Sequence, residues 1–322
     1  MSINNGEILF VKSVKDGIPN RDPLQDSDVR RIFPEEDGRI SLTDVSIKRD
    51  VRDYIIDAEP DGGKEKKNYI YIQEKFNDKG NLLGRASLAK LIAKEVGKEK
   101  KSQKDMKSVL IEHCFDVRTF GVVYSVTPKF NLTGPVQFTW AHSLHPVDSQ
   151  YVQGTVVIPS KDVKQDSSDE EGGKTQGTIW TSYIVPFAVF SMSGVINAKN
   201  AIHTQMTLED QELLLKALWQ GTLHRQARGR GQQQPLFLMH IEYNDPFFRI
   251  GYIEDLINIK PEGDAWRANS KRPSSLKEIE LDVSDLLKAI EKYKDKIARC
   301  RVWVNDQLKV IGEIDQYKQK LW

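Results

Sequence analysis

The chain has 322 residues, 39% of them hydrophobic and 29% charged, which favours a soluble globular protein of one large domain or two moderate ones. Its 47 Lys and Arg nearly balance 46 Asp and Glu, so the formal net charge of +1 excludes a polycation. No apolar run approaches the ~18 residues of a membrane span, and MSINNGEILF lacks the basic start of a signal peptide, so we expect a cytoplasmic protein that contacts no membrane.

The first predicted elements are a strand and a helix. Residues 6–14 alternate as a strand does, and 15–24 form a loop rich in turn formers. Residues 41–55 are expected to be a helix, with Ser41 and Asp44 as its cap signature. Its apolar side chains recur on one face, at Ile47, Val51, Tyr54 and Ile55.

A lysine-rich helical region and a sheet-like passage are expected next. Residues 68–76 favour a strand, and 84–114 a helical region. Between Phe115 and Pro146, apolar residues alternate with polar ones, with Gly and Pro between the runs. A strand needs one apolar face, and its other face can carry donors and aromatic rings for a polymeric anion. An ordinary two-sided sheet gives the same pattern, so both interpretations stay open.

A long hairpin is expected after this passage. Two strands, at 151–159 and 177–197, flank residues 161–174, which are acidic and almost free of apolar side chains and should form an exposed tip. Trp180 and Tyr183 lie close to the base of the hairpin. Such aromatic residues either wedge between nucleic-acid bases or hold the ribbon to the body of the protein.

A second capped helix is expected at 207–226. Thr207 and Asp210 form its cap signature. Its predicted core positions include Leu214, Leu218 and Leu223.

The C-terminal part is expected to hold strands at 235–243 and 278–283, a helix at 284–298 and a final strand at 301–304. The strongest elements of the chain follow the order strand, helix, strands, helix, strand, with a large insertion after the first helix. This order predicts an α+β protein on the split βαβ plan of the ferredoxin-like fold. The same plan underlies RNA-recognition (RRM) modules.

Three cations on the first helix are candidates for binding nucleic acid. Lys48 and Arg52 are one turn apart, and Arg49 lies beside them. Two cations at this spacing match successive phosphates of a nucleic-acid backbone. The alternative is a solvated face, because Asp44 precedes Lys48 by four residues and suits a helical ion pair.

Further arginines follow the first strand and the second helix. Asn20 and Asp22 are expected to shape a turn, whereas Arg21 either belongs to that turn or projects toward the basic helix. The exit of the second helix carries three more arginines, Arg225, Arg228 and Arg230. They either form a flexible cationic loop or complement the helix dipole.

We expect no metal, no cofactor and no catalytic residue. Cys114 and Cys300 do not have the spacing of metal ligands, so we expect both to be small buried hydrophobic residues. The histidines form no HExxH or HxH group, and Gly-rich phosphate loops are absent. Asp22 and His142 remain conceivable acid–base groups for cleaving RNA, but their spacing does not require that role.

Three motifs carry a resemblance to a known family. They are PNRDP at 19–23, TDVSIKRDVRDY at 43–54, and CFDVRTFG at 114–121 followed by GPVQFTWAHSLHP at 134–146. Together with the strand at 184–198 and the helix at 208–219, they resemble the RAMP-superfamily backbone subunit of type I CRISPR effector complexes (Cascade), most like subtypes B and C. The resemblance covers about residues 6–245.

The resemblance implies a division of the chain into four parts. An RRM-like, ferredoxin-like palm would comprise 1–60 and 177–322, the latter with a C-terminal extension. A helical finger insertion would occupy 61–115, and palm or web strands 116–150. A β-hairpin thumb would occupy 151–184.

The resemblance also implies a non-enzymatic role in the prokaryotic cytoplasm. Several copies would polymerise along one CRISPR guide RNA as a helical filament, each thumb displacing one nucleotide, and would present the guide for pairing with target DNA in antiviral defence. The implied partners are guide RNA, target DNA, further copies of the chain, the large Cascade subunit, a RAMP subunit that binds the 5′ end of the guide, and a helicase-nuclease recruited later.

The resemblance assigns RNA contacts to specific residues. Arg21, Lys48, Arg49 and Arg52 would hold guide phosphates, and Val123 would pack near a displaced base. The full expected RNA-binding set is Arg21, Lys48, Arg49, Arg52, Arg118, Val123, His142, Trp180, Arg228 and Arg230. The alternative is a RAMP-type endoribonuclease, because some type III relatives cleave RNA with a loop Asp; Asp22 would then cut bound or target RNA.

Overall fold

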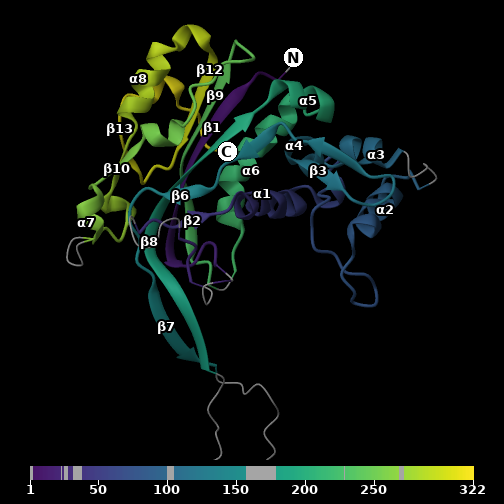
Figure 1. The fold of residues 1–322 in the computed structure, drawn as a ribbon, viewed down its shortest axis with the longest axis horizontal. Helices are drawn as coiled ribbons and strands as arrows, with labels where there is room; N and C mark the ends of the chain where they lie inside the picture. Colours follow the sequence, from purple (N-terminus) through teal and green to yellow (C-terminus); the bar gives the residue numbers. More distant parts are fainter. Residues whose placement is uncertain are drawn as a thin grey trace, which may run out of the picture.

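The protein is a mixed α/β molecule built on one large antiparallel sheet (Figure 1). The computed structural model describes residues 3–22, 24, 28–31, 38–99, 105–156, 179–227, 229–267 and 272–322. The predicted α+β class is therefore confirmed. Within this described part, no helix combines the length and apolar character needed to cross a membrane.

The large sheet has eight strands, and all of its pairings are antiparallel. Its main order is β12 (Ile297–Val304), β9 (Gln232–Tyr243), β1 (Gly6–Gly17), β8 (Ile179–Ile196), β6 (Ala141–Ser143) and β2 (Ser41–Leu42). Two further strands, β5 (Val136–Phe138) and β7 (Gln150–Thr155), also pair with β8. The β7–β8 ribbon projects from the body of the molecule (Figure 1).

Two smaller sheets lie outside it. One consists of β10 (Asn258–Lys260), β11 (Glu280–Asp282) and β13 (Lys309–Ile311), and the other of β3 (Gly121–Tyr124) and β4 (Phe130–Thr133). The α-helices are α1 (Asp44–Ala58), α2 (Arg85–Glu95), α3 (Met106–His113), α4 (Phe115–Phe120), α5 (Ala198–Thr204), α6 (Leu208–His224), α7 (Gly263–Arg267) and α8 (Ser284–Lys292). Short 3-10 turns include η1 (Pro60–Gly62), η3 (Ile253–Leu256), η4 (Leu276–Glu278), η5 (Lys294–Lys296) and η6 (Asp315–Tyr317).

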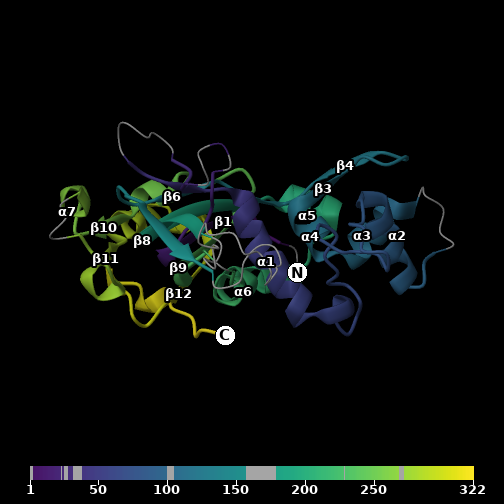
Figure 2. The same ribbon diagram turned by 90° about the horizontal axis from the view of Figure 1, so that it is seen from below.

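Alternation along β1 places the large sheet between two hydrophobic cores. Ile8 and Phe10 face a core shared with α1 and α6, whereas Leu9 and Val11 face a core shared with the C-terminal elements. A third core joins α2 and α3 to the β3–β4 hairpin. Figure 2 shows α2 and α3 at the end of the molecule opposite α7 and β10.

Helices α1 and α6 pack closely because of one glycine. A Cβ added at Gly221 would lie 2.4 Å from the main-chain oxygen of Asp50, so only glycine lets the two backbones approach this far. The predicted cap of α6 is confirmed, since Thr207 and Asp210 form a reciprocal capping box. The predicted cap of α1 is wrong: Ser41 belongs to β2, and Thr43 is the N-cap residue.

Residues 115–120 form helix α4 and not the predicted strand. All six side chains are buried, so the alternation of apolar residues carried no information about which face meets the core. The Asp116 carboxylate accepts the N–H groups of Tyr71 and Ile72, at 2.9 and 3.0 Å, and fixes the helix against that segment.

Other predicted elements differ at their edges. Residues 68–76 do not form the predicted strand and make isolated bridges instead, Tyr69 with Cys114 and Phe76 with Leu82. The helix expected to reach residue 298 ends at Lys292, and β13 follows the strand expected to be last. Leu223 is 39% exposed, unlike buried Leu214 and Leu218. The predicted acidic tip at 161–174 lies outside the described residues.

Two buried histidines give the fold a pH dependence. His145 stacks on Trp266, accepts the N–H of Val189 at 3.1 Å through Nε2, and donates from Nδ1 to the carbonyl of Pro146 at 2.8 Å. His240 accepts a hydrogen bond from Arg301 at 3.1 Å. The pKa of each histidine falls from 6.5 to about 3, chiefly because burial disfavours the charged ring.

We expect the free energy of unfolding to fall as the pH falls below 6.5. The unfolded chain binds protons at these imidazoles below that pH, whereas the fold keeps both rings neutral down to about pH 3. Each ring then lowers the unfolding free energy by up to about 1.4 kcal/mol per pH unit. Urea unfolding at several pH values tests this: His145→Gln should reduce the slope, and His203→Gln, at an exposed position, should not. Equal slopes in His145→Gln and the unaltered protein would contradict it.

Candidate nucleic-acid interface

A cleft lined by arginines lies where the end of β1 meets the first half of α1. Its volume is about 680 Å³, and one side is lined by residues that follow α6, namely Arg225, Ala227, Gly229 and Arg230. Five arginines line it: Arg21, Arg49, Arg52, Arg225 and Arg230. Glu74 supplies the one acidic side chain of this lining. The cleft therefore gathers cations from three separate segments of the chain: the residues after β1, helix α1 and the residues after α6.

The floor of the cleft rests on a buried carboxylate, that of Asp50 on α1. Asp50 Oδ2 lies 2.9 Å from Lys12 Nζ on β1. Its Oδ1 accepts Arg225 Nη1 at 2.9 Å and Arg230 Nη2 at 3.1 Å. Three cations thus converge on one carboxylate, and this cluster joins the central strand and the helix to Arg225 and Arg230, which follow α6.

Burial and charge act in opposite directions within this cluster. Burial by itself would raise the pKa of Asp50, but Lys12 and Arg230 bring the pKa below its ordinary 3.8. Burial lowers the pKa of Lys12 despite the attraction of Asp50. Because its folded pKa is depressed, Asp50 contributes stability above pH 3.8 that is lost only as the pH falls through the folded pKa.

Arg21 and Arg49 are the accessible cations of the cleft. The side chain of Arg49 is 40% exposed and pairs with Asp53 on the next turn of α1. Arg21 is exposed and donates to Ser182 Oγ on β8 at 3.0 Å. Gly229 makes room for it, since a Cβ there would lie 2.8 Å from Arg21 Nη2. Both guanidinium groups can therefore meet an anion from solvent.

Lys48 and Arg52 are held against the protein. Arg52 is buried, with Nε 3.1 Å from Asp116, and its guanidinium lies 5.3 Å from the centre of the Phe120 ring. Lys48 pairs with Asp44 at 2.8 Å, so the ion pair considered as its alternative role is present. Arg52 is among the residues that line the cleft although its side chain is only 11% exposed, and Lys48 does not line it.

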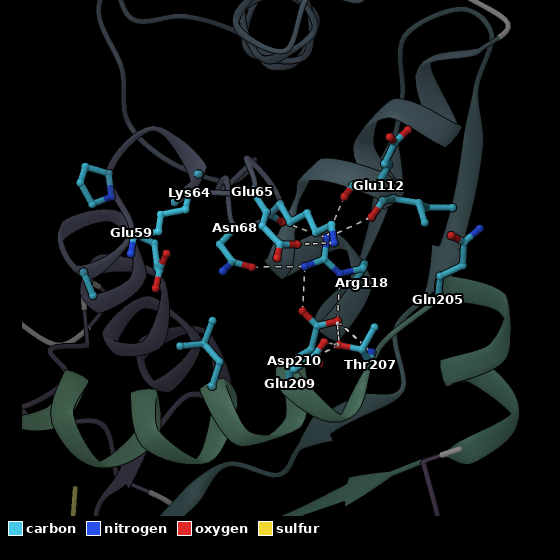
Figure 3. Close-up of a pocket in the computed structure, with 17 residues that line it drawn as sticks. Glu59, Lys64, Glu65, Asn68, Glu112, Arg118, Gln205, Thr207, Glu209 and Asp210 are labelled. Carbon is cyan, nitrogen blue, oxygen red and sulfur yellow. Dashed lines mark hydrogen bonds and ion pairs between the residues drawn. The ribbon is translucent and has the colours of Figure 1, made fainter. Parts of the chain in front are cut away.

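Arg118 is in the interior and is removed from the expected RNA contacts. Nε and Nη2 of its guanidinium bind the Asp210 carboxylate at 2.9 and 2.7 Å, as Figure 3 shows. Its Nη1 donates to the carbonyls of Lys67, Ile111 and Glu112 at 2.9 to 3.2 Å. Because α4 is a helix, Arg118 points inward and joins α4 to the capped start of α6, which leaves no donor for a phosphate.

Three further expected RNA contacts, Val123, His142 and Trp180, do not line the cleft. Val123 on β3 is 63% exposed. His142 is half-buried on β6, opposite Ser41. Trp180 on β8 lies over Gly154, where a Cβ would come within 2.6 Å of the indole. Arg228 lies outside the described residues.

The sequence prediction left Arg225 and Lys12 out of the site. Arg225 follows α6 directly and had been noted there only as a loop or dipole cation. Lys12 had a clear signal: alternation along β1 places it on the same face as Phe10 and Val14, so it is a cation in a core position. A buried lysine requires a buried partner, and Asp50 is that partner.

Asp22, the candidate for RNA cleavage, is engaged in its own loop. Its Oδ1 accepts the N–H of Leu24 at 3.0 Å and lies 3.7 Å from an Arg30 guanidinium nitrogen. Over the described ranges, no group of three or more His, Cys, Asp or Glu could hold a metal ion. The hydrogen bond from the Leu24 N–H to Asp22 is typical of a carboxylate that shapes a turn.

Comparison with known proteins gives one family. A family model described as "CRISPR-associated protein Cas7" matches residues 4–284. The "CRISPR-associated protein Cas7" of Haloferax volcanii is 25% identical over 335 aligned positions, which cover 97% of this chain and 88% of that protein.

Two solved structures are similar to the whole fold. One, titled "CRISPR RNA-guided surveillance complex, pre-nicking", has a TM-score of 0.54 at 11% identity and covers 96% of both chains. The other, titled "CRISPR RNA-guided surveillance complex", has a TM-score of 0.51 at 12% identity and covers 97% of this chain and 96% of that one. At these identities the similarity concerns the fold alone.

We expect Asp50→Asn to reduce the unfolding free energy by about 3–5 kcal/mol, because it leaves Lys12 buried without a counter-charge. Asp53→Asn is the matched control: Asp53 also pairs with Arg225 but is more exposed, so its loss should cost at most about 1 kcal/mol. Urea unfolding measures both. Equal losses of unfolding free energy in the two variants would show that the buried Asp50 cluster contributes no more stability than the more exposed Asp53 pair.

Proposed function

This chain belongs to the Cas7 family of CRISPR-associated proteins, and from that membership we propose that it is a non-catalytic backbone subunit that binds guide RNA. Further copies would polymerise along the same RNA and present it for pairing with target DNA in antiviral defence. The observation that carries this proposal for the present chain is the arginine-lined cleft between β1, α1 and the residues after α6 that include Arg225 and Arg230.

The chemistry of the cleft suits a ribose–phosphate backbone. Guanidinium groups pair with phosphate oxygens through two parallel hydrogen bonds and make no distinction between bases. A protein that holds any guide sequence needs contacts of this kind, because base pairing between guide and target reads the sequence. The near-neutral total charge of +1 also fits repeated copies that lie side by side.

We propose the same four parts as the sequence indicated. The order β9–β1–β8, with α1 and α6 on one face, supports a ferredoxin-like palm from 1–60 and 177–322. The separate core around α2 and α3 supports a finger at 61–115, although β3 and β4 of the 116–150 web also contribute to it. The projecting β7–β8 ribbon supports a thumb at 151–184.

The contacts beyond the cleft remain proposals. Exposed Val123 would pack near a displaced base, His142 would lie beside the RNA path, and Trp180 would act at the thumb. The proposed partners are guide RNA, target DNA, further copies, the large subunit and the RAMP subunit at the guide 5′ end of a type I complex, and a helicase-nuclease recruited later. The proposed location is the prokaryotic cytoplasm.

We expect the double variant Arg21→Gln/Arg49→Gln to bind single-stranded RNA more weakly and with a shallower salt dependence. If each arginine neutralises one phosphate, the slope of log K against log salt concentration falls by about 1.4. Fluorescence anisotropy with labelled RNA at several salt concentrations measures both quantities. Neither side chain belongs to a core, so the melting temperature should stay close to that of the unaltered protein.

Lys288→Gln/Lys294→Gln is the charge-matched control. Both lysines are exposed on the C-terminal part, and each pairs only locally, with Asp285 and Glu291. It should keep the RNA affinity and the slope of the unaltered protein. An unchanged slope in the Arg21/Arg49 variant, or an equal change in this control, would remove the cleft from the RNA path.

We expect no metal-dependent cleavage of guide-bound complementary RNA. The Asp22 carboxylate is occupied by the Leu24 N–H and faces Arg30, an arrangement that shapes a turn. Purified protein with guide and labelled complement, with and without Mg²⁺, should leave the RNA intact. Regularly spaced cuts that disappear in Asp22→Ala would establish the endoribonuclease instead.

A further inference from the structure

A large aromatic side chain is exposed near the cleft, outside the residues expected to bind RNA. Trp140 follows β5 and directly precedes β6, and it is 44% exposed. It lies two residues before His142, so the two side chains share one side of this segment. Neighbouring Ala141 and Ser143 are buried. The chain therefore directs the indole outward, whereas Ala141 and Ser143 face inward.

An arginine lies against the indole. The guanidinium carbon of Arg30 is 5.7 Å from the centre of the Trp140 ring, within cation–π range. Arg30 is held there because its carbonyl accepts the N–H of Ser41 at 2.7 Å and its guanidinium lies 3.7 Å from Asp22. Arg30 Nε is buried and has no hydrogen-bond partner among the described residues. The pair is thus a preformed aromatic and cationic surface.

Strand register places this surface beside the arginine cleft. β2 and β6 end with Leu42 opposite Ala141, so Thr43 and Trp140 are the residues immediately beyond this last pair of the antiparallel register. Thr43 lines the cleft and caps α1. Figure 1 shows β2 and β6 in the part of the body from which the β7–β8 ribbon projects.

We propose that Trp140, supported by Arg30, is a stacking surface for one nucleobase of the RNA strand whose phosphates lie in the cleft. This inference rests on the proposed guide-RNA binding and adds a base contact to it. Stacking on an indole is tolerant of sequence because every base has a π face, so the contact is compatible with any guide. The Arg30 guanidinium lies within cation–π range of the indole ring. Its positive charge also attracts the phosphates of the RNA strand.

The neighbourhood favours RNA over a protein partner. A protein contact would gain most from an apolar surround, but Trp140 is flanked by exposed Thr139 and half-buried His142 and has Arg30 against its ring. The five arginines of the adjacent cleft are a source of positive potential that concentrates polyanions at this position.

Two substitutions distinguish stacking on an aromatic face from simple contact with an apolar side chain. Trp140→Leu keeps an apolar side chain but removes the aromatic face, and Trp140→Phe keeps an aromatic face. The probes are a short labelled single-stranded RNA and the matched chain of abasic ribose phosphates, compared by fluorescence anisotropy. We expect Trp140→Leu to weaken binding of the RNA at least about fivefold, Trp140→Phe to retain most of it, and neither to alter binding of the abasic chain.

Trp322→Leu is the matched control. Trp322 is 41% exposed and stacks on Trp303 of β12, at the edge of the large sheet opposite β2, so its loss should leave RNA affinity unchanged. Near-ultraviolet circular dichroism and melting temperature check the fold of each variant, and Trp140→Phe keeps the test informative if Trp140→Leu unfolds.

Three other results would overturn the stacking inference, and one of them would also overturn the proposed function. Equal affinities of Trp140→Leu and the unaltered protein for RNA would overturn the stacking inference and leave the proposed function standing. Unchanged affinity with fewer copies bound to a long RNA, measured by sedimentation, would make Trp140 a contact between copies and also overturn it. Failure of the unaltered protein to bind either probe would overturn the proposed function, and this inference with it.

Discussion

The placement of the cleft depends on one buried carboxylate. Asp50 is enclosed between the central strand and α6, and such a charge is tolerated in the interior only when it is fully paired. Its partners are Lys12 on β1 and Arg225 and Arg230 after α6. The ionic cluster therefore fixes the floor of the cleft to the core of the sheet. Gly221 lets α6 approach the Asp50 main chain, so the close packing of α1 on α6 and the ionic cluster meet at the same residue.

The arginines of the cleft divide into held and accessible groups. Arg225, Arg230 and Arg52 are bound by the carboxylates of Asp50 and Asp116, so they contribute positive potential and a fixed shape. Arg21 and Arg49 remain reachable from solvent and are suited to pair with phosphate oxygens. This division explains how a chain with a net charge of +1 presents accessible cations within a defined cleft.

Sequence patterns predicted those features that depend on local rules. The capping box of Thr207 and Asp210 and the alternation of β1 follow from short-range geometry, and both are present. The motifs also indicated the family, which the comparisons confirm. Patterns were wrong at Phe115–Phe120, where every side chain is buried and periodicity cannot distinguish a helix from a strand. That error placed Arg118 on a sheet face, whereas it pairs with Asp210, a partner 92 residues away along the chain that no local pattern identifies. Lys12 was recognisable, since a lysine on the apolar face of a strand requires a buried partner.

Arginine-selective chemical modification with and without guide RNA, read by mass spectrometry, tests the central claim most directly. If the cleft holds the RNA backbone, phenylglyoxal should modify Arg21 and Arg49 in the free protein and much less in the complex, while interior Arg118 stays unmodified in both. Equal modification of Arg21 and Arg49 in the free and RNA-bound protein would contradict the account, because the strand would then lie elsewhere.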